Sequence, residues 1–163
     1  MKPNIYTDLA VETTQLYKEI HKGEPDGVRA EYPSFGNINI TRVEILNSIG
    51  AENIGKPIGT YITIDLPPDK SDYSKVVSQT SEVVKNEMRR VVGNRIEQPI
   101  MVVGLGNLSV TADSLGPKVV ENIKVTRHLF KLIPDDLQQG LRTVSALTPG
   151  VLGTTGIETK RRK

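Results

Sequence analysis

The sequence contains no cysteine, and aromatic residues make up only 4% of its 163 residues. The absence of cysteine excludes thiol catalysis, zinc-thiolate sites and a disulfide framework. No apolar run reaches the roughly 18 residues that a membrane span needs, and the first residues do not have the pattern of a signal peptide. We therefore expect a soluble, cytoplasmic protein with no membrane partner, long enough to bury a core without disulfides or a structural metal.

The net positive charge of the chain comes entirely from its last four residues. The formal net charge is +2, but residues 160–163 carry four positive charges, so the remainder of the chain has a net charge of −2. Proteins that bind nucleic acid usually spread basic residues over one face and stack aromatic residues on single strands. Neither pattern is present, so we expect no nucleic-acid partner. The basic tail is interpreted as a solvated end or a cloning remnant.

Residues 1–37 show no sustained hydrophobic periodicity, and glycine and proline gather in their second half. We interpret this segment as a mobile lead-in, with a short helix whose N-cap is Thr7 or Asp8. The pattern then becomes alternating, which predicts an α/β domain over residues 38–159, followed by the basic tail.

Within this domain the periodicity predicts strands that alternate with helices. The first strand loses phase at Thr41-Arg42, as a β-bulge would cause. A helix capped by Ser71 or Asp72 has apolar residues at the 3.6-residue period, and Gly93 ends it. A continuous apolar run then predicts a central parallel strand that is buried on both faces. The expected strands cover residues 38–45, 60–66, 100–103 and 142–147, and the expected helices cover residues 72–92 and about 114–130.

Asp113 lies where the third predicted strand breaks on a glycine turn and continues as a helix. The carboxyl ends of strands are where α/β enzymes place catalytic groups. Hydrolysis of an amide by two carboxyl groups needs one ionised acid, which takes a proton from water, and one protonated acid, which donates a proton. The start of a helix favours the ionised form of Asp113. The alternative role is structural, because an aspartate at this position is often only an N-cap.

Two glycine-containing loops are further candidates for substrate binding. Gly104 and Gly106 follow the third strand, but Ser109 replaces the third glycine of the dinucleotide fingerprint, which excludes that motif. The two glycines either offer backbone N–H groups to a substrate oxyanion or form only a tight turn. Asn107 hydrogen-bonds either the substrate or the turn. Gly150 lies in the second loop, which either borders a substrate channel or simply connects two elements.

Four ungapped blocks of the sequence resemble the germination protease family, the endopeptidases that start the degradation of the small acid-soluble proteins of bacterial spores. The resemblance continues more thinly upstream and so covers most of this chain, but only about the first half of a typical family member. The blocks are residues 102–107, 110–123, 125–130 and 145–159, and the thinner upstream segments are residues 7–12 and 59–64.

The resemblance implies a fold, a mechanism and a life cycle. The implied fold is an α/β three-layer sheet with flanking helices, similar to the phosphorylase/hydrolase type and apparently truncated here. The implied enzyme is an atypical aspartic protease made as a zymogen that assembles into homotetramers in the forespore and spore core. One catalytic aspartate of the family falls on Asp113, and its partner lies beyond the glycine-rich loop. The autoprocessing site falls on the bond between Asp8 and Leu9, so the propeptide would be about residues 1–8.

Because the second catalytic aspartate has no position in this sequence, we expect the 163-residue chain alone to be inactive. Two alternatives remain. One is a metal-dependent endopeptidase related to the hydrogenase maturation proteases, in which an acid equivalent to Asp113 holds a divalent metal. The other is a non-catalytic truncated or split subunit. A single carboxylate does not make a metal site, and His21 and His128 have no metal-ligand spacing, so we expect no metal and no cofactor.

Overall fold

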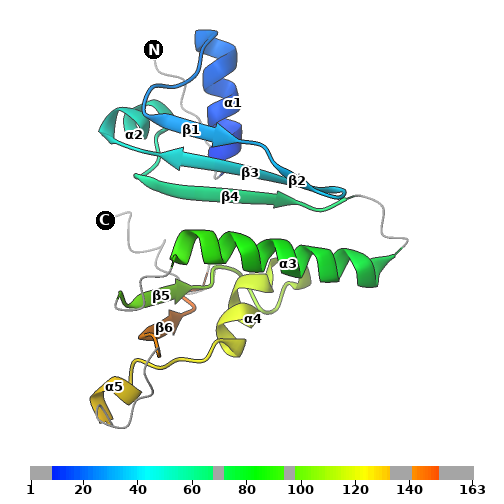
Figure 1. The fold of residues 1–163 in the computed structure, drawn as a ribbon, viewed down its shortest axis with the longest axis vertical. Helices are drawn as coiled ribbons and strands as arrows, with labels where there is room; N and C mark the ends of the chain where they lie inside the picture. Colours follow the sequence, from blue (N-terminus) through cyan, green and yellow to red (C-terminus); the bar gives the residue numbers. More distant parts are fainter. Residues whose placement is uncertain (1–8, 68–71, 94–97, 133–140, 151–163) are drawn as a thin grey trace. The chain divides into compact units, whose positions relative to one another are not determined.

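The computed structural model describes residues 9–67, 72–93, 98–132 and 141–150 (Figure 1). The chain divides into two compact units, Met1–Gly93 and Asn94–Lys163. Each unit combines helices with strands, so the expected α/β class is confirmed. No helix within these described ranges is long and apolar enough to cross a membrane.

An antiparallel sheet forms the centre of the first unit. Its middle strand is β3 (Ile38–Ile45), with β1 (Val28–Glu31) and β2 (Ser34–Phe35) along one edge and β4 (Gly59–Asp65) along the other. The pairing of β3 with β4 runs without a break, so the predicted bulge at Thr41-Arg42 is wrong. The alternation fails there for another reason.

The apparent loss of phase in β3 arises because both faces of the strand are covered. Ile38 and Ile40 lie on one face, in a buried cluster with Val83 of α3 (Tyr73–Val92). Residues on the opposite face are also buried, and α1 (Ala10–His21) contacts the strand. A strand that is covered on both faces does not need to alternate.

The limits of α3 follow from its capping residues, as the sequence predicts. The Asp72 carboxylate accepts a hydrogen bond of 3.0 Å from the Lys75 N–H. This bond satisfies one of the backbone donors at the start of the helix. At the other end Gly93 adopts a φ of 59°, a conformation that favours glycine and stops the helix.

The first part of the chain differs from the expected lead-in. Helix α1 follows Leu9 directly, and the expected N-caps at Thr7 and Asp8 lie outside the described residues. Strands β1 and β2 form in a segment that has no periodicity of its own, because their hydrogen bonds come from β3. The short helix α2 (Ser48–Ile54) follows β3, and α1 contacts it. The proposed division into residues 1–37, 38–159 and 160–163 remains a prediction.

The second unit is built on two parallel strands, β5 (Ile100–Val103) and β6 (Val144–Leu147), drawn in green and orange in Figure 1. The parallel pairing confirms the sequence prediction. The strand β5 is not buried on both faces within the described part of the chain, because Met101 and Val103 are exposed. Between the strands lie the 3-10 helix η1 (Thr111–Asp113) and two α-helices, α4 (Leu115–Asn122) and α5 (Leu129–Leu132).

The single helix expected to continue to Phe130 is wrong, because α4 ends at Asn122 and Phe130 lies in α5. The segment between the two helices is hydrogen-bonded to β6 instead. The buried hydroxyl of Thr126 donates to the Arg142 carbonyl at 2.5 Å and accepts from the Val144 N–H at 2.9 Å. Local helical periodicity therefore gives way to contacts between residues that are distant in the sequence.

A cluster of ion pairs joins β3 to α3. The Arg42 guanidinium binds the Glu87 carboxylate through two hydrogen bonds of 2.7 and 2.6 Å, and Glu31 through a third of 3.0 Å. The side chains of Arg42 and Glu87 are only 15% and 8% exposed. Hydrogen bonding from Arg42 lowers the pKa of the Glu87 carboxyl below its ordinary value, and burial opposes this effect. The same bonds raise the pKa of Arg42.

We expect Glu87→Gln to lower the free energy of unfolding at pH 7 by about 3 kcal/mol, because it removes the buried ionic partner of Arg42 and leaves only the more exposed Glu31. The pKa of Glu87 is lower in the folded state than the unfolded value of about 4.3, so the pair stabilises the fold above that pH. This contribution is lost as the pH falls through the folded-state pKa. Urea unfolding followed by circular dichroism from pH 7 to pH 3 measures both effects.

The matched control is Glu82→Gln, which breaks the exposed pair between Glu82 and Lys85 on the same helix. Water screens an exposed pair, so this variant should remain close to the wild type in stability and in its acid dependence. Equal losses in both variants would show that the Arg42–Glu87 pair has no special role.

Candidate functional site

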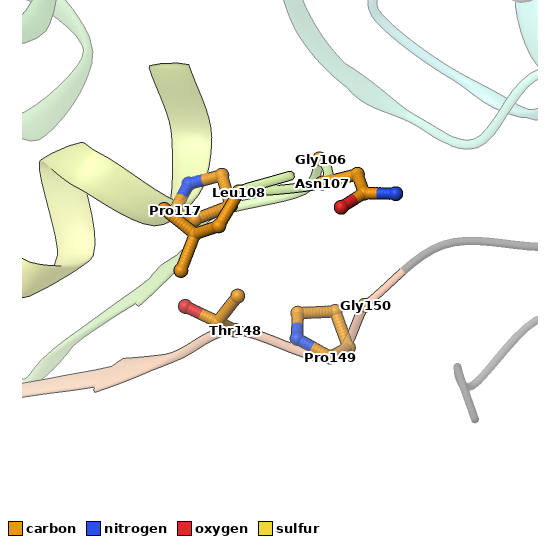
Figure 2. Close-up of a pocket in the computed structure, with 7 residues that line it drawn as sticks. All are labelled: Gly106, Asn107, Leu108, Pro117, Thr148, Pro149 and Gly150. Atoms are coloured by element: carbon orange, nitrogen blue, oxygen red, sulfur yellow. The ribbon is translucent and has the colours of Figure 1, made fainter. Parts of the chain in front are cut away.

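The loops that follow β5 and β6 line a pocket of about 280 Å³. Because the two strands are parallel, their carboxyl ends lie at the same edge of the sheet and bring these loops together. In Figure 2, Leu108 and Pro117 lie on one side of the pocket, and Thr148 and Pro149 lie across from them. The described residues that line the pocket are Gly106, Asn107, Leu108, Pro117, Thr148, Pro149 and Gly150.

The loop after β5 packs directly against the first turn of α4 because the contacting residues are glycines. A Cβ atom on Gly104 would overlap the backbone of Gly116, and one on Gly116 would overlap the backbone of Leu105. A Cβ atom on Gly106, whose φ is 140°, would overlap the carbonyl oxygen of Asp113. The glycines therefore permit a close approach of two backbone segments, which is more than a tight turn requires.

Asp113 is the last residue of η1, and its carboxylate is exposed. Its backbone is held at both ends: the N–H donates to the Val110 carbonyl at 2.9 Å, and the carbonyl accepts from the Asn107 N–H at 3.0 Å. Across the described ranges its carboxylate has no hydrogen bond or ion pair. The N-cap of α4 is Ser114, and no side chain caps the helix there. The structural alternative for Asp113, a cap of the following helix, is therefore wrong.

The polar groups near the pocket divide into those that hold the loop together and those that remain available. The Gly104 N–H donates to the Leu147 carbonyl at 3.0 Å, and this bond extends the ladder between the two strands. The Asn107 side-chain oxygen accepts from the Ser109 N–H at 2.9 Å and so stabilises the turn. In the part of the chain that the structure describes, the Asn107 side-chain nitrogen and the Gly106 N–H have no partner. These two groups can donate to a ligand.

The structure brings three of the expected site residues into one pocket, namely Gly106, Asn107 and Gly150. Gly104 directly follows β5 and packs against Gly116, but it is not one of the described lining residues. Asp113 does not line the pocket, although its carbonyl is hydrogen-bonded to Asn107.

The expected processing site lies in the first unit. Asp8 falls outside the described residues, and Leu9 is an exposed residue in extended conformation immediately before α1.

Two lining residues were not considered for substrate binding from the sequence: Leu108 and Pro117. Thr148 and Pro149 begin the loop that contains Gly150, and the glycine-rich pattern of this loop was the signal for a substrate channel. Leu108 and Pro117 have no such signal. Their place in the lining depends on the close packing of α4 against the loop, which a one-dimensional pattern does not express.

Metal binding has no support from clustered side chains. Over the described ranges no group of three or more histidine, cysteine, aspartate or glutamate side chains is arranged to hold a metal ion. Asp113 therefore offers one carboxylate ligand at most from this part of the chain.

Comparisons with known proteins all find the same family. A sequence model of the germination protease family matches residues 6–161. The chain is 45% identical over 157 residues to the germination protease of Clostridium perfringens, an alignment that covers 96% of this chain and 48% of that protein. It is 43% identical over 159 residues to the germination protease of Clostridium acetobutylicum, covering 96% and 49%. It is 39% identical over 163 residues to that of Bacillus mycoides, covering 97% and 44%.

We expect Gly116→Ala to destabilise the second unit, although alanine is favoured over glycine inside helices by about 1 kcal/mol. The added methyl group would meet the Leu105 nitrogen at 2.8 Å and its carbonyl carbon at 2.9 Å. Backbone atoms cannot move aside as a flexible side chain can, so overpacking should lower the free energy of unfolding by about 1–3 kcal/mol. Urea unfolding measures the change.

Gly23→Ala is the control, because its methyl group would meet no atom closer than the His21 carbonyl oxygen at 3.9 Å. This variant should be nearly as stable as the wild type. A Gly116→Ala protein more stable than the wild type would contradict the close backbone packing.

Proposed function

The chain belongs to the germination protease family, and from this premise we propose that it is part of an endopeptidase that starts the degradation of small acid-soluble spore proteins during germination. The chain spans about half the length of the curated relatives it matches. The activity and the substrates proposed here are therefore those of a complete protein. The proposed overall fold, beyond the α/β class, is a three-layer sheet similar to the phosphorylase/hydrolase type.

The observation that carries the proposal is the Asp113 carboxylate, which follows the loop after β5 and has no partner among the described residues. Catalytic groups of α/β enzymes gather at the carboxyl ends of strands. Among the described residues Asp113 neither caps α4 nor forms an ion pair, so no structural role occupies its carboxylate. In the aspartic-type mechanism that we propose, this group takes a proton from the attacking water, and a second carboxyl group donates a proton to the leaving amine.

The loop after β5 supplies the second part of the proposal. Peptide hydrolysis passes through a tetrahedral intermediate whose oxyanion needs hydrogen-bond donors. The Gly106 N–H and the Asn107 side-chain nitrogen are donors without a partner in the described part of the chain. Both residues line the pocket, and the Asn107 N–H is tied to the Asp113 carbonyl at 3.0 Å. This arrangement supports a substrate-binding role for the loop beside the proposed catalytic residue.

The resemblance also supports a life cycle for the protein. We propose that a zymogen is made in the forespore, assembles into homotetramers and loses residues 1–8 by cleavage between Asp8 and Leu9. Leu9 is exposed and lies immediately before α1, and exposed positions near a chain end are where proteolytic cleavage concentrates. Light scattering of the complete gene product checks the assembly, and any state other than a tetramer contradicts that part.

We expect Asp113→Asn to lower kcat/KM for cleavage of a small acid-soluble spore protein by at least about 100-fold in the complete gene product, because asparagine cannot accept the proton. The carboxylate has no partner among the described residues, so the free energy of unfolding should change little. Initial rates measured by gel electrophoresis, together with urea unfolding, separate lost chemistry from lost folding.

Glu121→Gln is the matched control, because it neutralises a different exposed carboxylate. Glu121 lies on α4, eight residues after Asp113. It should retain the wild-type rate. Full activity in Asp113→Asn would refute the catalytic assignment. Loss of wild-type activity in a chelator, followed by recovery with one divalent metal, would replace the aspartic mechanism with the metal-dependent alternative.

The isolated 163-residue chain should cleave neither a spore protein nor its own bond between Asp8 and Leu9. Two-carboxylate hydrolysis needs a second acid besides Asp113, and none of the described residues that line the pocket is an aspartate or a glutamate. Gel electrophoresis of a spore protein and intact-mass measurement of the chain check the two statements. Cleavage at either place that disappears in Asp113→Asn would show that the chain carries a complete catalytic site.

A further inference from the structure

The two edges of the sheet in the first unit differ in how they are protected. On one edge lie β1 and β2, which are four and two residues long, and β1 carries Arg29 and Glu31. On the other edge lies β4, whose seven residues pair with β3 along their whole length (Figure 1). Natural proteins protect an edge strand by short length, lysine, proline or a bulge. None of these occurs in β4, and its only charged residue is Asp65 at its end.

The outer edge of β4 is open in the part of the chain that the structure describes, because β3 is the only strand that pairs with it there. Backbone N–H and C=O groups alternate in direction along a strand, so every second residue of β4 directs them away from β3. A further strand can satisfy these groups. Exposed apolar side chains also lie on both sides of the strand, Ile58 at 61% and Leu66 at 56%. Such an edge favours pairing with another strand.

A second copy of β4 matches this edge when the two strands run antiparallel about Ile62. Ile62 is the middle residue of β4, so this register pairs all seven residues of each strand. On the face that packs against the buried cluster, Ile62 lies opposite its own copy, and Thr60 lies opposite Ile64. On the other face, Tyr61 lies opposite Thr63. Aromatic and β-branched side chains pack well against one another across strands, so each of these pairs stabilises the contact.

The same register also agrees with the ends of the strand. Ile58 lies opposite Leu66 of the second copy, so the two exposed apolar side chains contact each other. Asp65 lies opposite Gly59, which places the two Asp65 residues at opposite ends of the pair, about 20 Å apart. A parallel pair in register would instead place the two Asp65 carboxylates side by side, and like charges destabilise a sheet. Both ends of β4 therefore favour the antiparallel arrangement.

We propose that the outer edge of β4 binds β4 of a second copy of this chain, in an antiparallel pair centred on Ile62 that joins two four-stranded sheets into one of eight strands. A two-fold axis at Ile62 closes the assembly, because each copy uses its own open edge. The proposal goes beyond the proposed function and does not depend on Asp113 or on peptide cleavage. It assigns a contact surface, whereas the homotetramer proposed above states only a number of copies.

Disulfide cross-linking tests the register, because the chain has no cysteine of its own. Opposed residues of an antiparallel pair have Cα atoms about 4.5–5.5 Å apart, within the range that a disulfide bridges. Under mild oxidation, Ile62→Cys should form at least about 10-fold more disulfide-linked dimer than Thr60→Cys, whose two copies lie about 14 Å apart in this register. Thr60→Cys mixed with Ile64→Cys should form a heterodimer. Ile49→Cys, an exposed position on α2, is the control. Non-reducing gel electrophoresis measures the products.

Sedimentation velocity tests the contact in the unmodified 163-residue chain, which should form a dimer whose fraction rises with concentration. Thr60→Lys places a charge opposite Ile64 of the second copy and should raise the Kd of the dimer at least about 10-fold. The matched control is Ser34→Lys, which changes another exposed hydroxyl residue, on the opposite edge of the same sheet. This control should dimerise as the wild type does.

Ile62 packs against the buried cluster, so Ile62→Cys can fail to fold. A mixture of Tyr61→Cys and Thr63→Cys then tests the same register from the other face of the strand. A chain that is monomeric at all concentrations would overturn the proposal, as would equal cross-linking of Thr60→Cys alone. Protection of the β4 amides from exchange by a spore protein, without a dimer, would assign the edge to an extended peptide instead. A tetrameric gene product without a β4 cross-link would refute this contact and leave the proposed assembly intact.

Discussion

The close approach of two backbone segments at Gly104, Gly106 and Gly116 determines the geometry of the candidate site. A side chain at any of the three positions would overlap backbone atoms of the facing segment. Single hydrogen bonds contribute about 1 kcal/mol each and can be exchanged for others, but an overlap of backbone atoms must be relieved by movement of the chain. The other features of the site therefore depend on the packing of α4 against the loop after β5. Pro117 reaches the pocket, and the Asp113 carbonyl reaches Asn107, because this contact is short.

The contact also leaves the Asp113 carboxylate outside the pocket lining. The carbonyl of Asp113 is directed toward the Asn107 N–H, at 3.0 Å, while its carboxylate is exposed and outside the pocket lining. An exposed carboxylate keeps its hydration, so its position carries no desolvation cost. An apolar pocket lining instead favours a group that carries no charge. The turn from Asn107 to Asp113 therefore places a hydrated carboxylate outside a pocket whose described lining residues are uncharged.

The sequence predicted those features that depend on local pattern. The cap at Asp72, the end of α3 at Gly93 and the parallel strand β5 all follow from residues next to one another in the chain. The bulge in β3 and the continuous helix after Asp113 were wrong because contacts between distant residues decide both regions. Arg42 is held by Glu87, which lies 45 residues away, and Thr126 is held by Val144, which lies 18 residues away.

The same distinction applies to the candidate site. Gly106, Asn107 and Gly150 were predicted from glycine-rich loops at the ends of strands, and the structure brings them into one pocket. The sequence left open whether Asp113 caps a helix, because a carboxylate before a helix has the same pattern in both roles. Only the geometry of Ser114 at the N-cap position separates them. Leu108 was invisible for a similar reason: its neighbours in space come from another loop.

The first unit depends on a different constraint, the ion pair between Arg42 of β3 and Glu87 of α3. Arg42 lies where the sequence pattern wrongly predicted a bulge. A buried Arg42–Glu87 pair contributes less net stability than its short hydrogen bonds suggest, since both ions lose water. Its effect on the geometry is stronger, because the planar guanidinium donates two parallel hydrogen bonds to a carboxylate only when the two groups lie nearly in one plane. A shift of α3 by one residue would separate the two groups. A charged residue within an apolar strand thus fixes which turn of α3 faces β3. In the second unit, the absence of side chains at Gly104, Gly106 and Gly116 fixes the position of α4.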